Sequence, residues 1–179
     1  MSFYKKTFEL LNRFVSVSTL YQYGFNYSPM YRRSTGKIIF VSKDLREITV
    51  RIRISWRNRN YMNSVFGGSM FSAVDPIPMI QWMNLLGDKY IVWDKSAEIK
   101  FKRPARENLY AKFSCSESEL KQVIQRVDDE DEIEHTVTTY LTNQSGEVVY
   151  CEVHKKLYIA KKEFYQEKQM NRLRNRNLA

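Results

Sequence analysis

A long apolar segment at residues 68–86 limits the fold of this chain more than any other feature. Few polar residues interrupt it, and its apolar positions are Met70, Phe71, Val74, Ile77, Ile80, Met83 and Leu85. A helix that is apolar on nearly all sides is normally buried. Pro76 and Pro78 lack the amide that bonds back one turn, so they must kink or restart this helix. Gly87 is placed to end it.

Segments with the two-residue period of β-strands lie on both sides of this helix. We expect strands at about residues 37–41, 48–55, 97–102, 109–115, 133–142 and 147–159. The last two flank a hairpin turn, Asn143-Gln144-Ser145-Gly146. This order of elements predicts an α+β fold, in which an antiparallel sheet of five to six strands curls around one central helix. Such a sheet leaves one face free, often for a partner subunit.

The remaining segments decorate this core. Residues 4–15 have the spacing of a short amphipathic helix, and residues 16–35 are aromatic and turn-rich, so we expect them to be irregular. Residues 117–127 predict a short exposed helix followed by an acidic turn, and residues 161–175 predict a basic terminal helix. We therefore divide the chain into an N-terminal helical and irregular extension, a central domain and a basic tail, at residues 1–35, 36–160 and 161–179.

Composition excludes several classes of protein. The 179 residues suit one domain, and no run of apolar residues is long enough for a transmembrane helix. The start of the chain lacks the pattern of a secretory signal. Two cysteines and two histidines argue against a disulfide framework or a zinc site, so we expect the cytoplasm and no metal. The net charge of +9 comes largely from residues 155–179, so it selects no specific nucleic-acid function.

Gly67, Gly68 and Ser69 begin the apolar helix. The first amides of any helix are unpaired, and the helix dipole adds partial positive charge there. Glycine also lets a carbonyl group approach the backbone closely. These are the physical requirements of an oxyanion hole, the site that stabilises negative charge on a reacting carbonyl oxygen. The alternative is a helix start with two glycines that serve packing alone.

Asp75 lies in the middle of the same apolar helix. A buried carboxylate is unfavourable unless it is paired or hydrated, so it is either a general base or nucleophile, or a cap for the helix after Pro76. Eight residues of helix separate Asp75 from Gly67 by about 12 Å, whereas attack needs reacting atoms within about 3–3.5 Å. Two chains with antiparallel helices could bring the groups together, which predicts a dimer with two shared sites.

The spacing of these residues resembles a known family. Asn60 precedes Phe66-Gly67-Gly68 by six residues, and Asp75 follows Phe66 by nine. Together with Leu86-Gly87, Tyr90-Ile91-Val92-Trp93-Asp94-Lys95 and Ile99-Lys100-Phe101-Lys102-Arg103-Pro104, this pattern resembles the hotdog-fold acyl-CoA thioesterase superfamily over residues 20–160. It looks like a bacterial branch of thioesterase-like proteins and domains of unknown function. The resemblance implies the hotdog fold, which is a curled sheet around one central helix.

The resemblance also implies roles for individual residues. The Gly67 amide would polarise the thioester carbonyl, Asp75 of the other subunit would activate water or attack, and Asn60 would help to hold the carbonyl or the water. Phe66 stands where these thioesterases usually have histidine, and a phenyl ring donates no hydrogen bond. The further residues that we expect to contact the substrate are Phe66, Gly68, Asn63, Asp94 and Arg103.

Coenzyme A would enter as part of the substrate, and no other cofactor is expected. Its phosphates could be bound by basic residues near these segments, namely Arg57, Arg59, Lys102, Arg103 and Arg106. Candidates to line an acyl tunnel are Phe71, Met79, Trp82, Met83 and Trp93, although such residues usually serve the core. We interpret His135 and His154 as structural.

Three hypotheses follow. The first is a cytoplasmic homodimer, or a dimer of dimers, that hydrolyses an acyl-CoA thioester. The second is an acyl-CoA-binding or lipid-binding protein without catalysis, which the phenylalanine at position 66 favours. The third is a protein whose basic tail, residues 161–179, binds nucleic acid or an anionic membrane.

Overall fold

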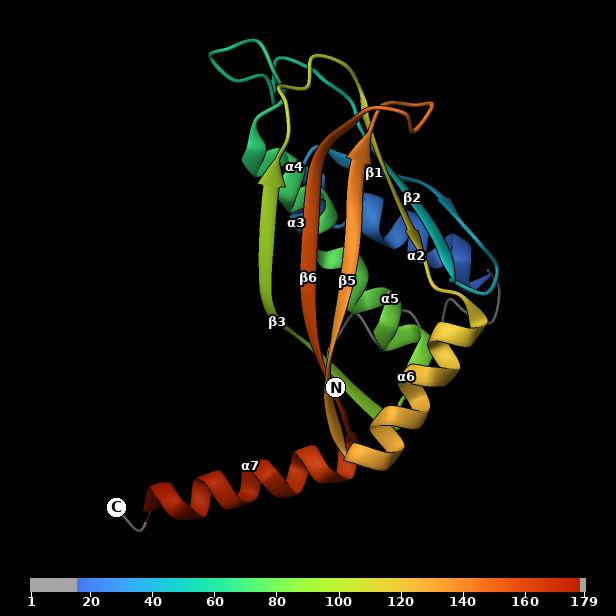
Figure 1. Ribbon diagram of the computed structural model, residues 1–179, viewed down its shortest axis with the longest axis vertical. Coiled ribbons are helices and arrows are strands. Elements are labelled where there is room, and N and C mark those ends of the chain that lie inside the picture. The colour runs from blue at the N-terminus through green and yellow to red at the C-terminus, as the bar shows by residue number, and fades with distance from the viewer. Residues whose placement is uncertain (1–15, 178–179) are drawn as a thin grey trace.

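The computed structural model describes residues 16–177 and contains one antiparallel six-stranded sheet. The helix expected at residues 4–15 lies outside the described residues. The strands are β1 (Gly36–Val41), β2 (Glu47–Ile52), β3 (Tyr90–Phe101), β4 (Leu109–Ser114), β5 (Glu132–Thr142) and β6 (Val149–Lys161). They are arranged in the order β1-β2-β4-β5-β6-β3, so β1 and β3 form the two edges of the sheet (Figure 1).

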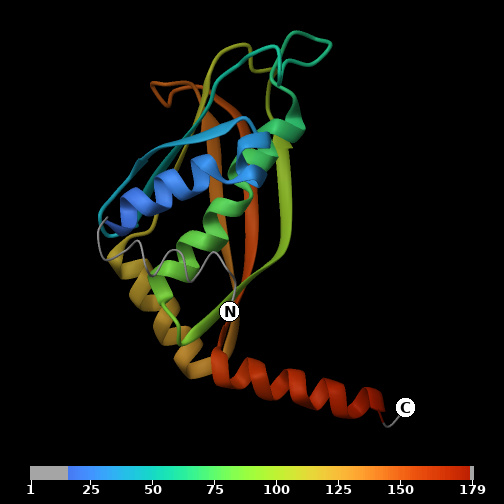
Figure 2. The same ribbon diagram turned by 180° about the vertical axis from the view of Figure 1, so that it is seen from behind.

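The central helix is divided as its prolines predict. α4 (Gly67–Val74) and α5 (Pro76–Leu86) run end to end along one face of the curled sheet (Figure 2). α5 restarts at Pro76 and ends at Gly87, whose φ of 77° is easily adopted by glycine. The predicted α+β fold, a curled antiparallel sheet around a central helix, is therefore confirmed.

Two groups of buried side chains fill the space between this helix and the sheet. One lies around α4 with β1, β2 and β4, and includes Ile38, Val50 and Ala73. The other lies around α5 with β5, β6 and α6 (Glu117–Glu130), and includes Trp82 and Ile159. The alternation read from the sequence explains this packing, because in β2 the residues Ile48, Val50 and Ile52 are all buried.

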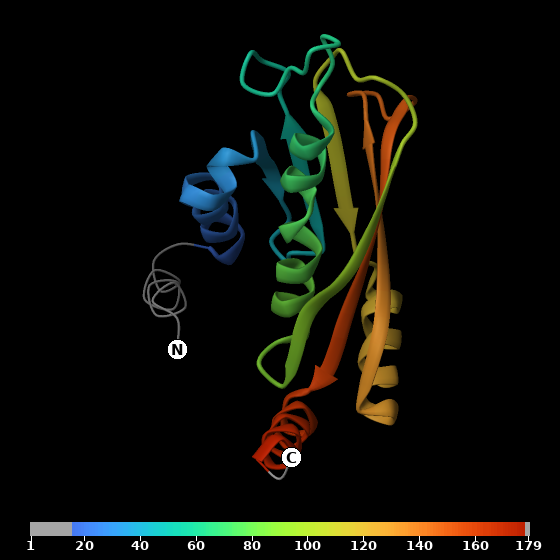
Figure 3. The same ribbon diagram turned by 90° about the vertical axis from the view of Figure 1, so that its left-hand side faces the viewer.

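The expectation that residues 16–35 are irregular was wrong. They form α2 (Val17–Tyr27) and α3 (Pro29–Arg33), which pack beside the central helix and β1 (Figure 3). The Ser16 side chain caps α2 by accepting a hydrogen bond from the Thr19 amide. Tyr31 is fully buried and donates its hydroxyl hydrogen to the carbonyl oxygen of Ala73 at 2.9 Å. The aromatic residues thus serve as a core for two short helices.

Two helices near the C-terminus were largely predicted. α6 begins after the capping residue Ser116, but it continues to Glu130, so the first part of the expected acidic turn is helical. Asp131 has a φ of 66° and ends α6. α7 (Lys162–Asn177) extends away from the sheet at the end of the chain (Figure 1). No helix within residues 16–177 is both long and apolar enough to cross a membrane.

Candidate functional site

The tip of α4 presents two free amides. Phe66 is the N-cap residue, and its carbonyl oxygen accepts hydrogen bonds from the amides of Ser69 and Met70 at 3.0 and 3.1 Å. Within residues 16–177, the amides of Gly67 and Gly68 have no hydrogen-bond acceptor. The helix therefore begins with two adjacent donors that could both point at one oxygen atom.

Two aromatic rings lie against these glycines. A Cβ atom added to Gly67 would lie 2.7 Å from the ring of Phe101, and one added to Gly68 would collide with the ring of Phe66. Both glycines thus also serve packing, as the alternative interpretation expected. Both rings are nevertheless 57% exposed, so the free amides are bordered by apolar surface that solvent reaches.

Asp75 forms part of a charged cluster with Lys155 and Asp94. Lys155 on β6 makes an ion pair with Asp75 at the end of α4, and its Nζ lies 3.0 Å from Oδ2 of Asp94 on β3. The Lys155 side chain is only 5% exposed, whereas each carboxylate side chain is 36% exposed. The buried ammonium group is thus balanced by two carboxylates that reach solvent, which is how a buried charge is tolerated.

Asp75 occupies the N-cap position of α5, but its side chain does not cap that helix, so the expected capping role was wrong. Its backbone is helical, with φ −51° and ψ −50°, and its carboxylate makes no capping hydrogen bond. A capping side chain bonds to the second or third amide of the following helix. Pro78 occupies the third position and has no amide hydrogen. The carboxylate is therefore free to pair with Lys155.

Sequence reasoning missed Lys155, although a signal for it existed. In β6 the residues of one parity are buried, namely Val153, Leu157 and Ile159, and Lys155 has the same parity. A lysine at an inward position of an alternating strand needs an anionic partner. The sequence alone could not say which carboxylate that partner is, because Asp75 is 80 positions away.

The loop of residues 55–65 uses Asn60 for its own structure. The Asn60 Oδ1 atom accepts hydrogen bonds from the amides of Met62 and Ser64 at 3.0 Å each, and its Nδ2 donates to the Ser64 hydroxyl at 2.9 Å. Asn63 is exposed at the loop tip with a φ of 58°. These contacts explain Asn60 and Asn63 as loop-forming residues and lend no support to contact with substrate.

Arg103 lies beside this loop, on the segment that follows β3. Its amide donates to the carbonyl oxygen of Tyr150 at 3.4 Å, and the neighbouring Ala105 carbonyl accepts from the Val65 amide at 2.8 Å. The side chain is exposed and makes no ion pair within the described residues. Arg103 is thus available to an anionic ligand.

The candidates for an acyl tunnel differ in exposure. Trp82 is a core residue, 2% exposed, and its ring meets that of His135 edge-on at 4.5 Å between centroids. Met83 and Trp93 are 45% and 52% exposed, and Phe71 and Met79 are half-buried. The contact of His135 with the Trp82 ring fits a structural role for this histidine. The other histidine, His154, pairs with Glu152, with 2.7 Å between Nε2 and Oε1.

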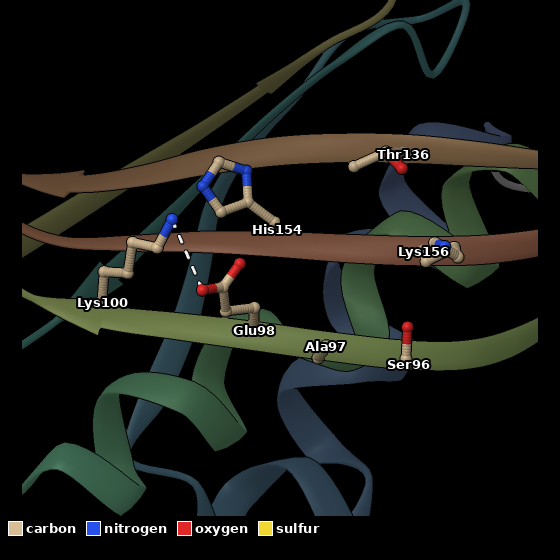
Figure 4. Close-up of a pocket in the computed structure, with 7 residues that line it drawn as sticks. All are labelled: Ser96, Ala97, Glu98, Lys100, Thr136, His154 and Lys156. Carbon is tan, nitrogen blue, oxygen red and sulfur yellow. Dashed lines mark ion pairs between the residues drawn. The ribbon is translucent and has the colours of Figure 1, made fainter.

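A hollow of about 420 Å³ lies on the outer face of the sheet, on the side away from the helices (Figure 4). It is lined by Ser96, Ala97, Glu98, Lys100, Thr136, His154 and Lys156. None of the residues predicted for the site lies in it. Among the described residues, no cluster of three or more histidine, cysteine, aspartate or glutamate side chains could hold a metal ion.

Comparisons with known proteins support the fold. A Pseudomonas aeruginosa protein of unknown function, described as a probable thioesterase, has a similar structure, with a TM-score of 0.69 and 17% identity over 80% of this chain and 95% of that chain. A protein of unknown function from Chlorobaculum tepidum has a TM-score of 0.64 and 13% identity, over 82% of this chain and 98% of that chain. A thioesterase from Haemophilus influenzae has a TM-score of 0.50 and 13% identity, over 86% of this chain and 90% of that chain. These likenesses establish the hotdog fold.

A search of curated proteins finds no match. A family profile, in contrast, matches residues 26–159. This range includes the central helix, the charged cluster and the whole sheet except the last two residues of β6. The chain therefore belongs to the family described as "Domain of unknown function (DUF4442)".

Proposed function

We propose that this protein is a homodimeric acyl-CoA thioester hydrolase. The observation that carries the proposal is the pair of unpaired amides at Gly67 and Gly68 on the same helix as a solvent-reaching carboxylate, Asp75. The descriptions of two similar structures as thioesterases support the same class of reaction. In this reaction, water adds to the thioester carbonyl carbon, the carbon–sulfur bond breaks, and a carboxylic acid and the free thiol of coenzyme A leave.

A dimer is needed because one chain cannot bring both groups to one carbonyl. Gly67 and Asp75 are about 12 Å apart along the helix. One stripe of the central helix is exposed or half-buried among the described residues, and it contains Gly68, Ser72, Asp75, Met79 and Met83. β3 also offers a free edge for pairing. If two copies pair with antiparallel central helices and the two-fold axis near Phe71, Gly67 faces Asp75 of the partner subunit.

The residues then divide the chemistry. The amides of Gly67 and Gly68 stabilise the negative charge that develops on the carbonyl oxygen. Asp75 of the partner subunit removes a proton from the attacking water. Lys155 of the partner subunit holds that carboxylate in place and is itself paired with Asp94. Arg103 is available for a phosphate of coenzyme A. Phe66 and Phe101 provide an apolar border for the acyl group.

The test is the rate of free-thiol release from a panel of acyl-CoA substrates. We expect Asp75→Asn to lower kcat/KM by about 100-fold or more, because a positioned general base contributes about 10²–10⁴-fold. Asp94→Asn is the matched control, since it also removes a carboxylate from Lys155 but leaves the proposed base. We expect it to lower kcat/KM by less than about tenfold. Equal effects of the two variants would remove the special role of Asp75.

A second experiment tests the arrangement of the dimer. Ser72→Cys places a thiol next to the proposed two-fold axis, on the exposed stripe of α4. We expect mild oxidation to link two chains through this residue, whereas Ser145→Cys, in the exposed hairpin turn, should remain monomeric under denaturing electrophoresis. The native cysteines, Cys115 and Cys151, are buried and should not interfere. Cross-linking at both positions or at neither would contradict the proposed axis.

The second candidate function is acyl-CoA binding without hydrolysis. It is favoured by Phe66, whose exposed ring stands where the resembling enzymes carry histidine. Calorimetry with a non-hydrolysable thioether analogue separates the two functions, because binding without turnover of the matching thioester supports this candidate. The cytoplasmic location and the assembly of dimers into tetramers stay predictions.

A further inference from the structure

We infer that loop 55–65 docks the protein onto the surface of an anionic lipid bilayer. The loop carries three of the most exposed large apolar side chains among the described residues: Trp56, Tyr61 and Met62 are 82%, 100% and 67% exposed. Exposed apolar side chains that gather on one loop mark an interaction surface rather than ordinary exposure. This inference concerns binding to a surface and is independent of the hydrolysis proposed above.

Two buried polar side chains fix the shape of the loop. Asn58 and Ser64 point inward and are 2% and 5% exposed. The Asn58 side chain accepts from the Ser55 amide at 2.8 Å and donates to the Arg53 carbonyl and the Thr35 hydroxyl, both at 3.0 Å. The buried asparagine thus holds the base of the loop in one shape, while the apolar side chains stay outside.

The backbone of the loop is also bonded internally. The Asn60 amide donates to the Ser64 carbonyl at 2.8 Å, and the Phe66 amide donates to the Asn58 carbonyl at the same distance. Arg59 and Val65 form a β-bridge. The amides and carbonyls that take part in these bonds need no water when the loop meets a lipid surface, where unsatisfied polar groups are unfavourable. Rigid pairing and an apolar tip together suit insertion at an interface.

The charge around the loop is positive. No acidic residue lies between Glu47 and Asp75, whereas Arg53, Arg57 and Arg59 are all exposed. None of these arginines forms an ion pair within the described residues. The Arg57 guanidinium lies 5.3 Å from the centroid of the Trp56 ring. Tryptophan and tyrosine favour the boundary between water and lipid, and arginines beside them attract anionic headgroups.

The position of the loop fits the same partner. It protrudes from one end of the molecule, at the end opposite α7 (Figures 1 and 3). A protruding tip matches a soft bilayer, whereas strand-like nucleic acid calls for a groove that follows its backbone. A symmetric contact between two copies through this tip would bring arginine against arginine, which is unfavourable. The charge and shape therefore favour an anionic bilayer over a second copy or a nucleic acid.

The experiment is flotation of the full chain with vesicles. We expect binding to vesicles containing about one third phosphatidylserine in phosphatidylcholine, and weak binding to pure phosphatidylcholine. The variant Tyr61→Ser with Met62→Ser should lower the partition coefficient by about tenfold or more, because it removes apolar side chains from the inserted tip. Arg57→Gln with Arg59→Gln should lower it by about 25-fold, at about fivefold for each arginine.

Two matched controls show whether this loop is the contact. Tyr27→Ser with Met30→Ser removes a similar exposed pair, 70% and 59% exposed, from α2 and α3. Arg174→Gln with Arg176→Gln removes two exposed charges from α7. Both controls should bind as the wild type does. Since all these side chains are exposed, the variants should fold normally, which circular dichroism verifies. Loss of binding in either control, equal to that in the loop variants, would overturn the inference.

Tryptophan fluorescence gives a second readout. Trp56 is exposed and Trp82 is buried, so insertion of the loop should shift emission to shorter wavelength, and Trp56→Phe should abolish most of the shift. A short single-stranded oligonucleotide serves as the competing polyanion. No binding to anionic vesicles, or binding to the oligonucleotide that the loop variants weaken equally, would overturn the inference. If the loop variants lose self-association, the loop mediates contact between copies of the chain, and the inference is overturned.

Discussion

The two halves of the central helix each meet a titratable side chain from the sheet, and the outcomes differ. Against α4, Lys155 is buried but paired with two carboxylates that reach solvent. Against α5, His135 is packed on Trp82, and its Nε2 lies 3.4 Å from Oε1 of Glu119, a long contact. Burial lowers the pKa of His135 below its ordinary value. One half keeps a charge beside two carboxylates that reach solvent, and the other keeps a histidine that is packed on a core tryptophan.

This difference indicates which half could perform chemistry. A histidine packed against a core tryptophan needs only to stay neutral, so a structural role explains its position. The charged cluster is less easily explained by stability, because replacing a buried ion pair by apolar groups is often neutral or stabilising. Substitutions in the α5 half should therefore mainly change stability, and those in the α4 half should mainly change activity.

The largest effect on stability is expected at Trp82. Trp82→Ala should lower the free energy of unfolding by about 3–5 kcal/mol, because it leaves a cavity in the α5 half of the core. Trp93→Ala is the matched control, since Trp93 is 52% exposed, and it should cost less than about 1 kcal/mol. Urea denaturation measures both. Similar losses for the two tryptophans would contradict the assignment of the α5 half of the central helix to stability.

A smaller effect is expected at Lys155. Lys155→Met leaves Asp75 and Asp94 close together without their cation, and it should lower the free energy of unfolding by about 1–2 kcal/mol, because both carboxylates remain partly hydrated. Adding Asp75→Asn and Asp94→Asn should recover part of this loss, since no charge is then unpaired. Urea denaturation of the single and triple variants tests this. A triple variant less stable than Lys155→Met would show that charge balance does not govern the cluster.

The smallest effect is the pH dependence that His135 contributes. Because burial lowers its pKa in the folded state, the unfolded chain takes up the proton first, and the protein should lose stability as the pH falls below about 6.5. His135→Gln should show a shallower loss between about pH 7 and pH 5. Thermal unfolding across this range measures the slope. Identical slopes for the wild type and the variant would mean that His135 is not held neutral by its core.

Much of the fold could be predicted from the sequence because local patterns control it. Alternation located the strands, although β3 begins at Tyr90 rather than near residue 97, and Pro76 located the break in the central helix. The helices within residues 16–35 were missed because their stability comes from tertiary contacts, such as that of the Tyr31 hydroxyl with the Ala73 carbonyl. The sequence around these tyrosines does not show which distant residues they contact.

The candidate site was predictable only in part. Spacing pointed to Gly67 and Asp75, and the amides of Gly67 and Gly68 are indeed free within the described residues. The pairing of Asp75 with Lys155 depends on three elements, α4, β3 and β6, meeting in space. Asn60 forms hydrogen bonds within its loop, and a short side chain that forms a turn looks the same in sequence as one that binds a ligand.

The most direct test of the central claim mixes two inactive variants. Gly67→Pro removes one of the two proposed oxyanion amides, and proline is tolerated at the first position of a helix. Phe66, with φ −62° and ψ 131°, suits a residue before proline, and the exposed ring of Phe101 must turn aside to make room for the proline ring. Asp75→Asn removes the proposed base. If each site takes Gly67 from one subunit and Asp75 from the other, unfolding and refolding a mixture should restore about a quarter of wild-type hydrolysis, since half of the dimers are mixed and each holds one intact site. Activity no greater than the sum of the two parents would contradict a shared site.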